Sequence, residues 1–253
     1  MLDTVTILPL LLAAFTVALA AGVIKGIVGF AMPMVLISGL STFMPPEQAL
    51  AGLILPTLVT NGLQALRQGP RAAWASIRRF RLFLAVGAVA LIAASQLVLV
   101  IPQQVFLLGL GIPVTLYALA TLIGVPMTLS ARSKAVSVGM GAFAGAVGGL
   151  SGVWGPMTVA YLTAYDLPKA EQMRVQGVIY GLGAVLLVGA HTASGVFNAQ
   201  SAQFSALLVV PAVAGLAVGF AIQDRMDQRR FKQATLLVLT VAGLNLIRRG
   251  LLG

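Results

Sequence analysis

The sequence predicts an all-α, polytopic membrane protein with about eight transmembrane helices, and three observations lead to this fold class. Of the 253 residues, 59% are hydrophobic and only 9% are charged, whereas a soluble domain of this length carries roughly 25% charged residues. Eight apolar runs approach the length of about 20 residues that crosses a bilayer. An internal duplication divides the chain into two similar halves, residues 1–128 and 129–253.

Short polar segments separate the eight apolar runs, which lie near 4–24, 47–66, 80–100, 104–128, 135–152, 172–190, 203–222 and 233–249. Asp3 stands before the first run, where a signal peptide carries positive charge, so we expect this run to remain as the first transmembrane helix. None of the polar segments is long enough for a soluble domain or a disordered linker. Residues 1–253 are therefore predicted to form a single transmembrane domain.

Two shorter apolar pieces, 30–44 and 153–165, follow the first and fifth runs. Glycine and proline interrupt both pieces, and these residues weaken helices. We predict that they form two broken or re-entrant elements in addition to the eight helices.

The charged residues exclude several classes of function. The net charge is +10, but the basic residues lie between apolar runs, as they do in cytoplasmic loops, and are not interleaved with exposed aromatic residues as on a nucleic-acid-binding surface. The chain has no cysteine, one histidine and six acidic residues, which leaves little for a metal centre or for acid–base catalysis. We expect no nucleic-acid partner, no metal, no cofactor and no enzymatic activity.

The duplication is clearest at the two broken elements. The segment 22-GVIKGIVGFAMPM-34 aligns with 145-GAVGGLSGVWGPM-157 at an offset of 123 positions. Five columns agree, since Gly22, Gly26, Gly29, Pro33 and Met34 align with Gly145, Gly149, Gly152, Pro156 and Met157. We therefore expect two matched breaks that together build one site.

The basic residues also indicate how the two halves are oriented. If the first element of each half returns to the side on which it started, 13 of the 16 Lys and Arg residues lie on one face. These 13 are in the segments 67–81, 130–134, 166–174 and 223–232. This arrangement obeys the positive-inside rule better than single crossings do. It predicts two halves of inverted topology, an architecture of transporters in which the site lies at the repeat interface.

Two interpretations apply to the residues of the first break. Gly22, Gly26 and Gly29 share one helical face, which is typical of close helix packing. Gly29 and Pro33 could instead open the backbone at membrane depth, where freed N–H groups at a helix N-terminus attract anions. Lys25, which aligns with Gly148, either faces a cavity and attracts an anion or extends to the lipid headgroups.

Polar residues on the following helices complete the candidate site. Thr57, Thr60, Asn61 and Gln64 form a polar stripe at helical spacing, which either lines a substrate path or bonds to a neighbouring helix. Gln172, Gln176 and Tyr180 share a face in the second half, and Trp154 either anchors at the interface or forms a pocket wall. The candidate substrate-binding residues are Lys25, Gly26, Gly29, Pro33, Asn61, Gln64, Gly149, Gly152, Trp154, Pro156 and Gln176.

The duplicated glycine and proline element, the proline-containing link and the following helix resemble the TauE/SafE family of membrane permeases. The resemblance covers residues 8–190 best and the last two helices by hydropathy only. It implies export of sulfite, of an organosulfur anion or of a carboxylate across a bacterial inner membrane. The segment 30-FAMPM-34 departs from the glycine-richer pattern of the family, and nothing in composition or spacing indicates sulfur specificity.

We therefore expect a transporter that exports a small anion by alternating access at the interface of the two repeats. Its expected partners are the anion and the phospholipid bilayer, and a homo-oligomer is compatible with the sequence. A passive anion channel and a membrane assembly factor without transport activity are the alternatives.

Overall fold

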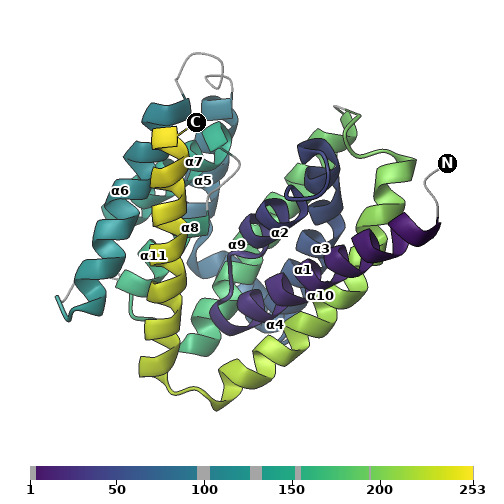
Figure 1. Cartoon of the computed structure of the whole chain (residues 1–253). Helices are drawn as coiled ribbons and strands as arrows, with labels where there is room; N and C mark the ends of the chain where they lie inside the picture. Colours follow the sequence, from purple (N-terminus) through teal and green to yellow (C-terminus); the bar gives the residue numbers. More distant parts are fainter. Residues whose placement is uncertain (1–3, 96–102, 126–132, 152–154, 194, 253) are drawn as a thin grey trace. The chain divides into compact units, whose positions relative to one another are not determined.

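A computed structural model describes residues 4–95, 103–125, 133–151, 155–193 and 195–252. Over these residues the chain forms eleven α-helices and no strand, which confirms the all-α class (Figure 1). The helices are α1 (Thr4–Val28), α2 (Met32–Leu40), α3 (Pro46–Leu66), α4 (Pro70–Arg79), α5 (Arg81–Ser95), α6 (Gln103–Leu122), α7 (Lys134–Ser151), α8 (Gly155–Ala164), α9 (Lys169–Ala193), α10 (Ala199–Arg225) and α11 (Gln228–Leu252).

Five of the described helices are long and apolar enough to cross a membrane, namely those containing Leu8–Val28, Glu47–Leu66, Lys169–Gly189, Ala199–Arg225 and Gln228–Leu252. Shorter apolar helices over Arg81–Ala94, Leu107–Leu122 and Lys134–Val147 fall at the three remaining predicted runs. The structure therefore supports a multi-pass membrane protein, and the number of eight crossings stays a prediction.

The helices form two compact units, each built from segments of both predicted halves. Unit 1 comprises Met1–Gln68 and Gln176–Asp227, and unit 2 comprises Gly69–Val175 and Gln228–Gly253. Unit 1 thus contains α1, α2, α3, α10 and most of α9. Unit 2 contains α4 to α8, α11 and the first turns of α9.

Unit 1 is organised around a close contact between α1 and α10. A Cβ atom at Gly22 would lie 2.2 Å from the carbonyl oxygen of Ala212, and one at Gly219 would lie 2.3 Å from that of Val23. Contacts advance along both helices in the same direction, so α1 and α10 run parallel. The adjoining hydrophobic core consists of Ala14, Ala18, Ala21, Met32, Leu36, Leu40, Ala49, Leu53, Leu208 and Ala212.

Helix α3 also packs against α10 and runs parallel to it. The Ser205 hydroxyl accepts a hydrogen bond from the Leu55 N–H (3.0 Å) and donates one to the Gly52 carbonyl (3.1 Å). At the far end of the helix pair, the Arg67 guanidinium forms an ion pair with Asp224 at 2.6 Å and lies 4.0 Å from the Phe220 ring centroid. These contacts hold the α3 end that carries the polar stripe.

Unit 2 contains a similar parallel pair, α5 and α7. A Cβ atom at Gly145 would lie 2.1 Å from the Gly87 carbonyl oxygen, and one at Gly141 would lie 2.8 Å from that of Phe83. Helices α6 and α11 pack antiparallel instead, because Gly111 meets Ile247 whereas Leu108 meets Gly250. In both units, glycines allow the helix backbones to approach closely.

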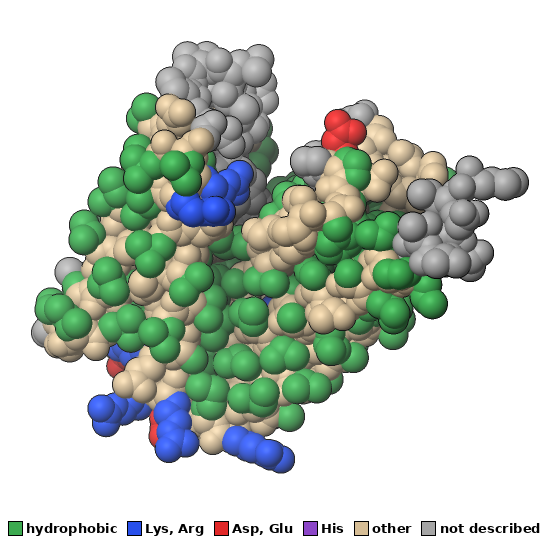
Figure 2. Space-filling view, in the orientation of Figure 1, with side chains coloured by type: hydrophobic (Ala, Val, Ile, Leu, Met, Phe, Trp, Pro, Cys, Tyr) green, Lys and Arg blue, Asp and Glu red, His purple; other side chains and the backbone are tan. Residues whose placement is uncertain are grey.

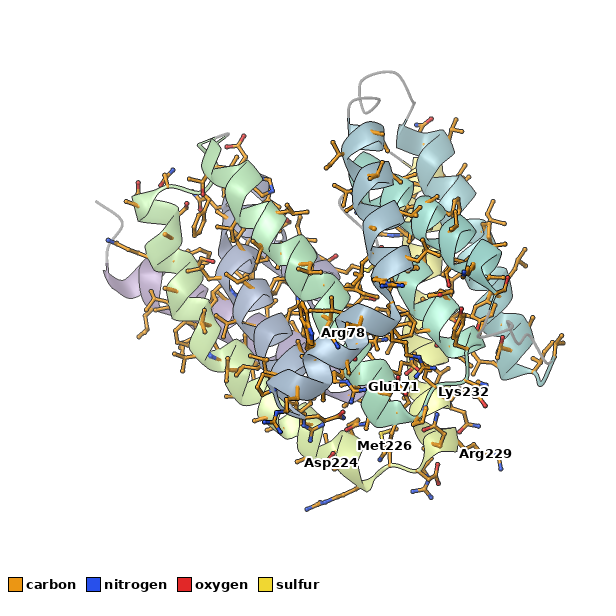
Figure 3. All side chains as sticks on the ribbon, turned by 180° about the vertical axis from the view of Figure 1, so that it is seen from behind. Arg78, Glu171, Asp224, Met226, Arg229 and Lys232 are labelled. Carbon is orange, nitrogen blue, oxygen red and sulfur yellow. The ribbon has the colours of Figure 1, made fainter. Side chains whose placement is uncertain are left out.

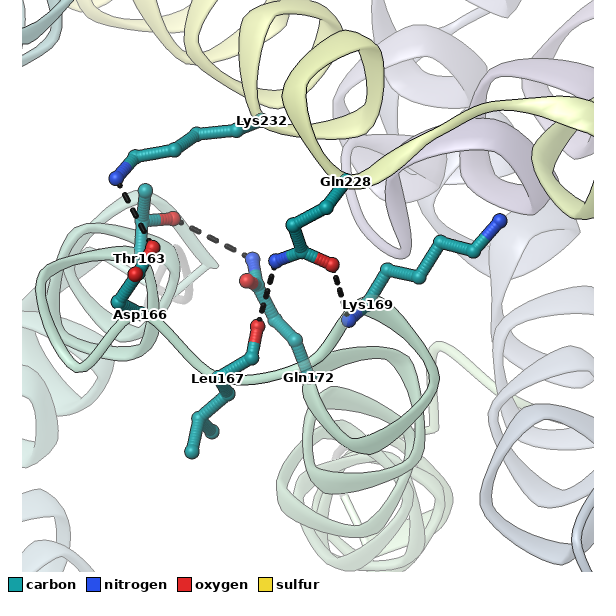
Figure 4. Close-up of polar contacts among 7 residues, drawn as sticks. All are labelled: Thr163, Asp166, Leu167, Lys169, Gln172, Gln228 and Lys232. Atoms are coloured by element: carbon teal, nitrogen blue, oxygen red, sulfur yellow. Dashed lines mark hydrogen bonds and ion pairs between the residues drawn. The ribbon is translucent and has the colours of Figure 1, made fainter.

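The start of α11 is joined to the turn between α8 and α9 within unit 2 (Figure 4). Lys232 forms an ion pair with Asp166 at 3.1 Å. The Gln228 side chain donates to the Leu167 carbonyl and accepts from the Lys169 N–H, each at 2.8 Å. These bonds satisfy backbone groups that a helix end would otherwise leave unpaired.

The segment 67–81, expected only as a polar connection, contains helix α4. Pro70 occupies its first turn, and Ala73, Ser76 and Phe80 are buried at helical spacing. Gly69 precedes it with a φ of 88°. In the sequence, the Gly69–Pro70 pair followed by apolar or small residues at helical spacing could have indicated this helix.

Apolar side chains face outward along the long helices, as a lipid-facing surface requires. Val210 on α10 and Val241 on α11 are 72% and 67% exposed. In Figure 2, hydrophobic side chains cover much of the visible side of both helices, and Lys and Arg side chains gather where α10 ends and α11 begins.

Candidate functional site

The first predicted break lies where the sequence places it, between α1 and α2 in unit 1. Gly29 and Ala31 both adopt left-handed backbone conformations, with φ of 86° and 73°. Pro33 lies in the first turn of α2, where its missing N–H costs nothing. The chain then reverses, because Gly39 of α2 lies against Val17 of α1.

We expect Gly29→Ala to lower the free energy of unfolding by about 1–2 kcal/mol, because a Cβ disfavours the left-handed conformation. Gly62→Ala is the matched control, since Gly62 lies inside α3 and a Cβ there meets no atom within 4 Å. Alanine at a helix interior is expected to stabilise by about 0.5–1 kcal/mol. Denaturant titration of both variants in detergent checks this contrast, and equal effects at the two positions would contradict it.

Lys25 points into the interior of unit 1. Its side chain is 1% exposed, and its ammonium group donates a hydrogen bond to the Asn61 side-chain oxygen. The Asn61 amide nitrogen in turn donates to the Tyr180 carbonyl at 3.1 Å. Asn61 therefore joins α1, α3 and α9, and the geometry does not favour the interpretation in which Lys25 extends to the headgroups.

The ammonium group of Lys25 makes no ion pair with an acidic side chain in the described part of the chain. Asn61 is neutral and is itself 1% exposed. Burying an ammonium group is costly unless it is paired. Lys25 is thus a buried positive charge whose identified partner is an amide oxygen.

The polar stripe of α3 faces the break. The Gln64 amide nitrogen donates to the Gly29 carbonyl at 3.1 Å, and the Thr60 hydroxyl donates to the Pro56 carbonyl at 2.6 Å and lies 3.2 Å from the Met32 sulfur. Interhelical hydrogen bonding, one of the two predicted interpretations, is therefore observed at Asn61, whereas Gln64 bonds to the break between α1 and α2. The bonds also bring the stripe, the break and Lys25 together.

Gln176 of α9 is fully buried in unit 1. Neither its amide nitrogen nor its amide oxygen has a hydrogen-bond partner among the described residues. The next residue, Gly177, packs on the α3 backbone, where a Cβ would lie 2.5 Å from the Ala65 nitrogen. Gln176 thus follows directly on the α9 backbone that packs against α3, and its buried amide has no hydrogen-bond partner among the described residues.

Gly26 has a packing role that sequence alone left open. A Cβ at this position would lie 2.5 Å from the Leu216 carbonyl oxygen. Gly26 thus faces α10, while Gly29, three residues later, opens the backbone.

Among the candidates from the second half, Gln176 lies in unit 1, and the others lie in unit 2 or outside the described residues. Gly149 belongs to α7 and Pro156 is buried in the first turn of α8, whereas Gly152 and Trp154 lie outside the described residues. In α8, Tyr161 stacks on Phe83 with ring centroids 4.8 Å apart. The structure therefore brings together the first-half candidates in unit 1, which also contains Gln176 of α9.

Across the residues that the structure describes, no group of three or more His, Asp or Glu side chains is arranged to hold a metal ion. The site consists of one cation, amides and hydroxyls. Such groups can bind and orient an anion.

A family model described as "Sulfite exporter TauE/SafE" matches residues 14–246 of the chain. The chain belongs to the TauE/SafE family. The matched range contains Lys25, both breaks and the stripe of α3, so the predicted resemblance is confirmed. The members of this family are transporters rather than enzymes, and membership implies a membrane transporter of sulfite or related anions. No curated protein and no solved structure matches the chain.

Two contacts in this TauE/SafE protein were not predicted. They are the Tyr180 carbonyl, which orients Asn61, and Met32, which lies against Thr60. No sequence pattern marks a backbone carbonyl as a contact. Met32 lies next to Pro33 in the duplicated segment, but methionine in an apolar run gives no signal of its own.

Proposed function

We propose that this TauE/SafE protein exports a small oxyanion, sulfite or an organosulfur anion, by alternating access, and that Lys25 is the charged contact of the substrate. The observation that carries the proposal is the buried ammonium group with its neutral partner. A lysine in a membrane-spanning segment costs about 2.5–3.5 kcal/mol at the helix centre, so it marks a substrate pathway when it does not reach the surface.

An anion would complete the coordination of Lys25. Its ammonium group has three N–H donors, and Asn61 accepts one of them. A charged oxygen acceptor forms a stronger hydrogen bond than an amide does. Gln176 offers two further buried polar atoms in unit 1, so we propose that it binds an uncharged or anionic oxygen of the same substrate.

The break contributes backbone groups to this proposed site. The first N–H groups of a helix have no intrahelical acceptor, and the helix dipole makes them attractive to anions. Helix α2 begins at Met32, directly after the two left-handed residues. Its N-terminus lies beside Gln64, which bonds to the Gly29 carbonyl.

We further propose that residues 1–128 and 129–253 are inverted repeats of a single transport domain. Three observations support this. Helices α6 and α11, the last of each half, pack antiparallel. The pairs α1–α10 and α7–α5 both run parallel. Connections expected on the basic face are joined by ion pairs, Arg67 with Asp224 in unit 1 and Lys232 with Asp166 in unit 2.

Reporter fusions at positions 195 and 227 test this topology. We expect position 227 to be cytoplasmic and position 195 to lie on the opposite side of the bacterial inner membrane. A cytoplasmic position 195 would contradict the inverted arrangement.

Export is the direction of anion transport that the membrane potential, negative inside, favours by about 2.3 kcal/mol per charge per 100 mV.

Proteoliposome transport tests the function itself. We expect saturable flux of sulfite or of another member of a panel containing thiosulfate, sulfonates and short carboxylates, and a raised melting temperature of the purified protein with the same anion. Flux that rises linearly with the gradient would indicate a passive channel. Absence of flux and of stabilisation across the panel would indicate an assembly factor.

A further inference from the structure

Helix α4 has an inner and an outer face of different chemistry. Ala73, Ser76 and Phe80 are buried, whereas Arg71, Trp74 and Arg78 are exposed. The three exposed residues are spaced at i, i+3 and i+7, so they share one side of the helix. Trp74 is 55% exposed, so its indole ring is not covered by the neighbouring helices.

Polar bonds fix the inner side of α4 to the start of α9 in unit 2. The Arg174 side chain donates to the Ser76 hydroxyl at 2.8 Å, and Arg79 forms an ion pair with Glu171. The carboxylate of Glu171 also lies 4.0 Å from Arg174. The orientation of α4 is therefore set, and its outer side is held outward.

The outer arginines carry charge that no described acidic residue neutralises. Arg71 and Arg78 make no ion pair among the described residues. Arg78 lies over Trp74, with its guanidinium carbon 5.6 Å from the ring centroid, and Figure 3 labels Arg78 on this helix. The outer side thus presents two guanidinium groups around one indole ring.

The position of α4 in the chain puts it next to the bilayer. It connects α3, a candidate membrane span, to the apolar helix α5, and at 10 residues it is too short to cross. Tryptophan is enriched at the headgroup level. Basic residues near the membrane surface are attracted to anionic lipids, so arginine and tryptophan on the exposed side of α4 both favour a position at the headgroups.

We propose that Arg71, Trp74 and Arg78 form a binding surface for the phosphate of an anionic phospholipid. Guanidinium groups bind phosphate oxygens in a bidentate manner, and the indole ring inserts between the headgroups. The connection between α9 and α10, which occupies the corresponding place in the second half, contains neither Lys nor Arg over residues 194–203. The lipid surface therefore belongs to one half and to one leaflet.

Native mass spectrometry of the full-length protein in detergent, titrated with phosphatidylglycerol or phosphatidylcholine, tests this proposal. We expect preferential binding of phosphatidylglycerol. Each basic residue near the membrane surface raises the affinity for anionic lipid about fivefold. The double variant Arg71→Gln/Arg78→Gln is therefore expected to bind the first phosphatidylglycerol about 30-fold more weakly. Trp74→Ala should weaken it as well.

The matched control is Arg248→Gln/Arg249→Gln, which removes the same charge from two exposed arginines at the end of α11. We expect this control to retain wild-type binding, and Arg71→Lys/Arg78→Lys to recover part of the loss. Equal weakening by both glutamine pairs, or none by the α4 pair, would overturn the proposal. So would full competition by soluble glycerol phosphate, since the surface would then be a site for free anions.

Discussion

Replacing Lys25 with glutamine is expected to reduce saturable anion transport in proteoliposomes by about 100-fold, the upper range for loss of a hydrogen bond to a charged group. The variant removes the buried positive charge and keeps a side chain that can still donate to Asn61. The folded protein should persist, because a neutral buried amide costs less than an unpaired ammonium. Initial rates measured against anion concentration, together with the melting temperature, check both parts.

Lys134→Gln is the control for this experiment. Lys134 is exposed at the start of α7 and belongs to the other unit, so its loss changes the net charge equally without touching the site. We expect wild-type transport from it. Transport by Lys25→Gln at the control rate would show that Lys25 has a structural role only, and it would contradict the proposed contact with substrate.

Asn61→Asp is a second, independent test of the role of the Lys25 charge. The carboxylate has almost the shape of the amide and would give Lys25 an internal counter-ion at the position of the Asn61 oxygen. It would also lose the donor that bonds to the Tyr180 carbonyl. We expect a folded protein that no longer gains thermal stability from the anion. Unchanged stabilisation by the anion would argue against charge complementarity at this site.

Gly219→Val is expected to prevent assembly of unit 1. A Cβ at this position would lie 2.3 Å from the Val23 carbonyl oxygen and 2.6 Å from the Gly26 Cα. Both are backbone atoms, so the steric clash can be relieved only if α1 and α10 move apart along their whole contact. Overpacking costs about 1–3 kcal/mol where side chains can adjust, and here no side chain can.

Gly189→Val serves as the control, because a Cβ there meets nothing within 4 Å and the residue belongs to the same unit. Fluorescence-detected size exclusion of the two variants compares folded yield and melting temperature. We expect loss of the monodisperse species for Gly219→Val and near wild-type behaviour for Gly189→Val. A well-folded Gly219→Val protein would show that α1 and α10 tolerate a wider spacing.

Local chemistry made part of this protein predictable from sequence. Hydropathy predicts an all-α membrane protein because backbone groups in lipid must be bonded within helices. Gly29 and Pro33 located the first break, since left-handed φ and a missing N–H are properties of single residues. Helical periodicity placed Asn61 and Gln64 on one face of α3, and the structure buries both.

Tertiary structure decided what those faces meet. Helical periodicity predicts which side chains share a face, but it does not predict which helix packs against that face. The sequence therefore could not predict that Asn61 bonds to Lys25 and to the carbonyl of Tyr180. The same limit applies to Gly26, whose packing depends on α10 from the other half of the chain. A lysine side chain can extend to the headgroups or turn inward in rotamers of similar energy. The helices packed around Lys25 select the inward direction.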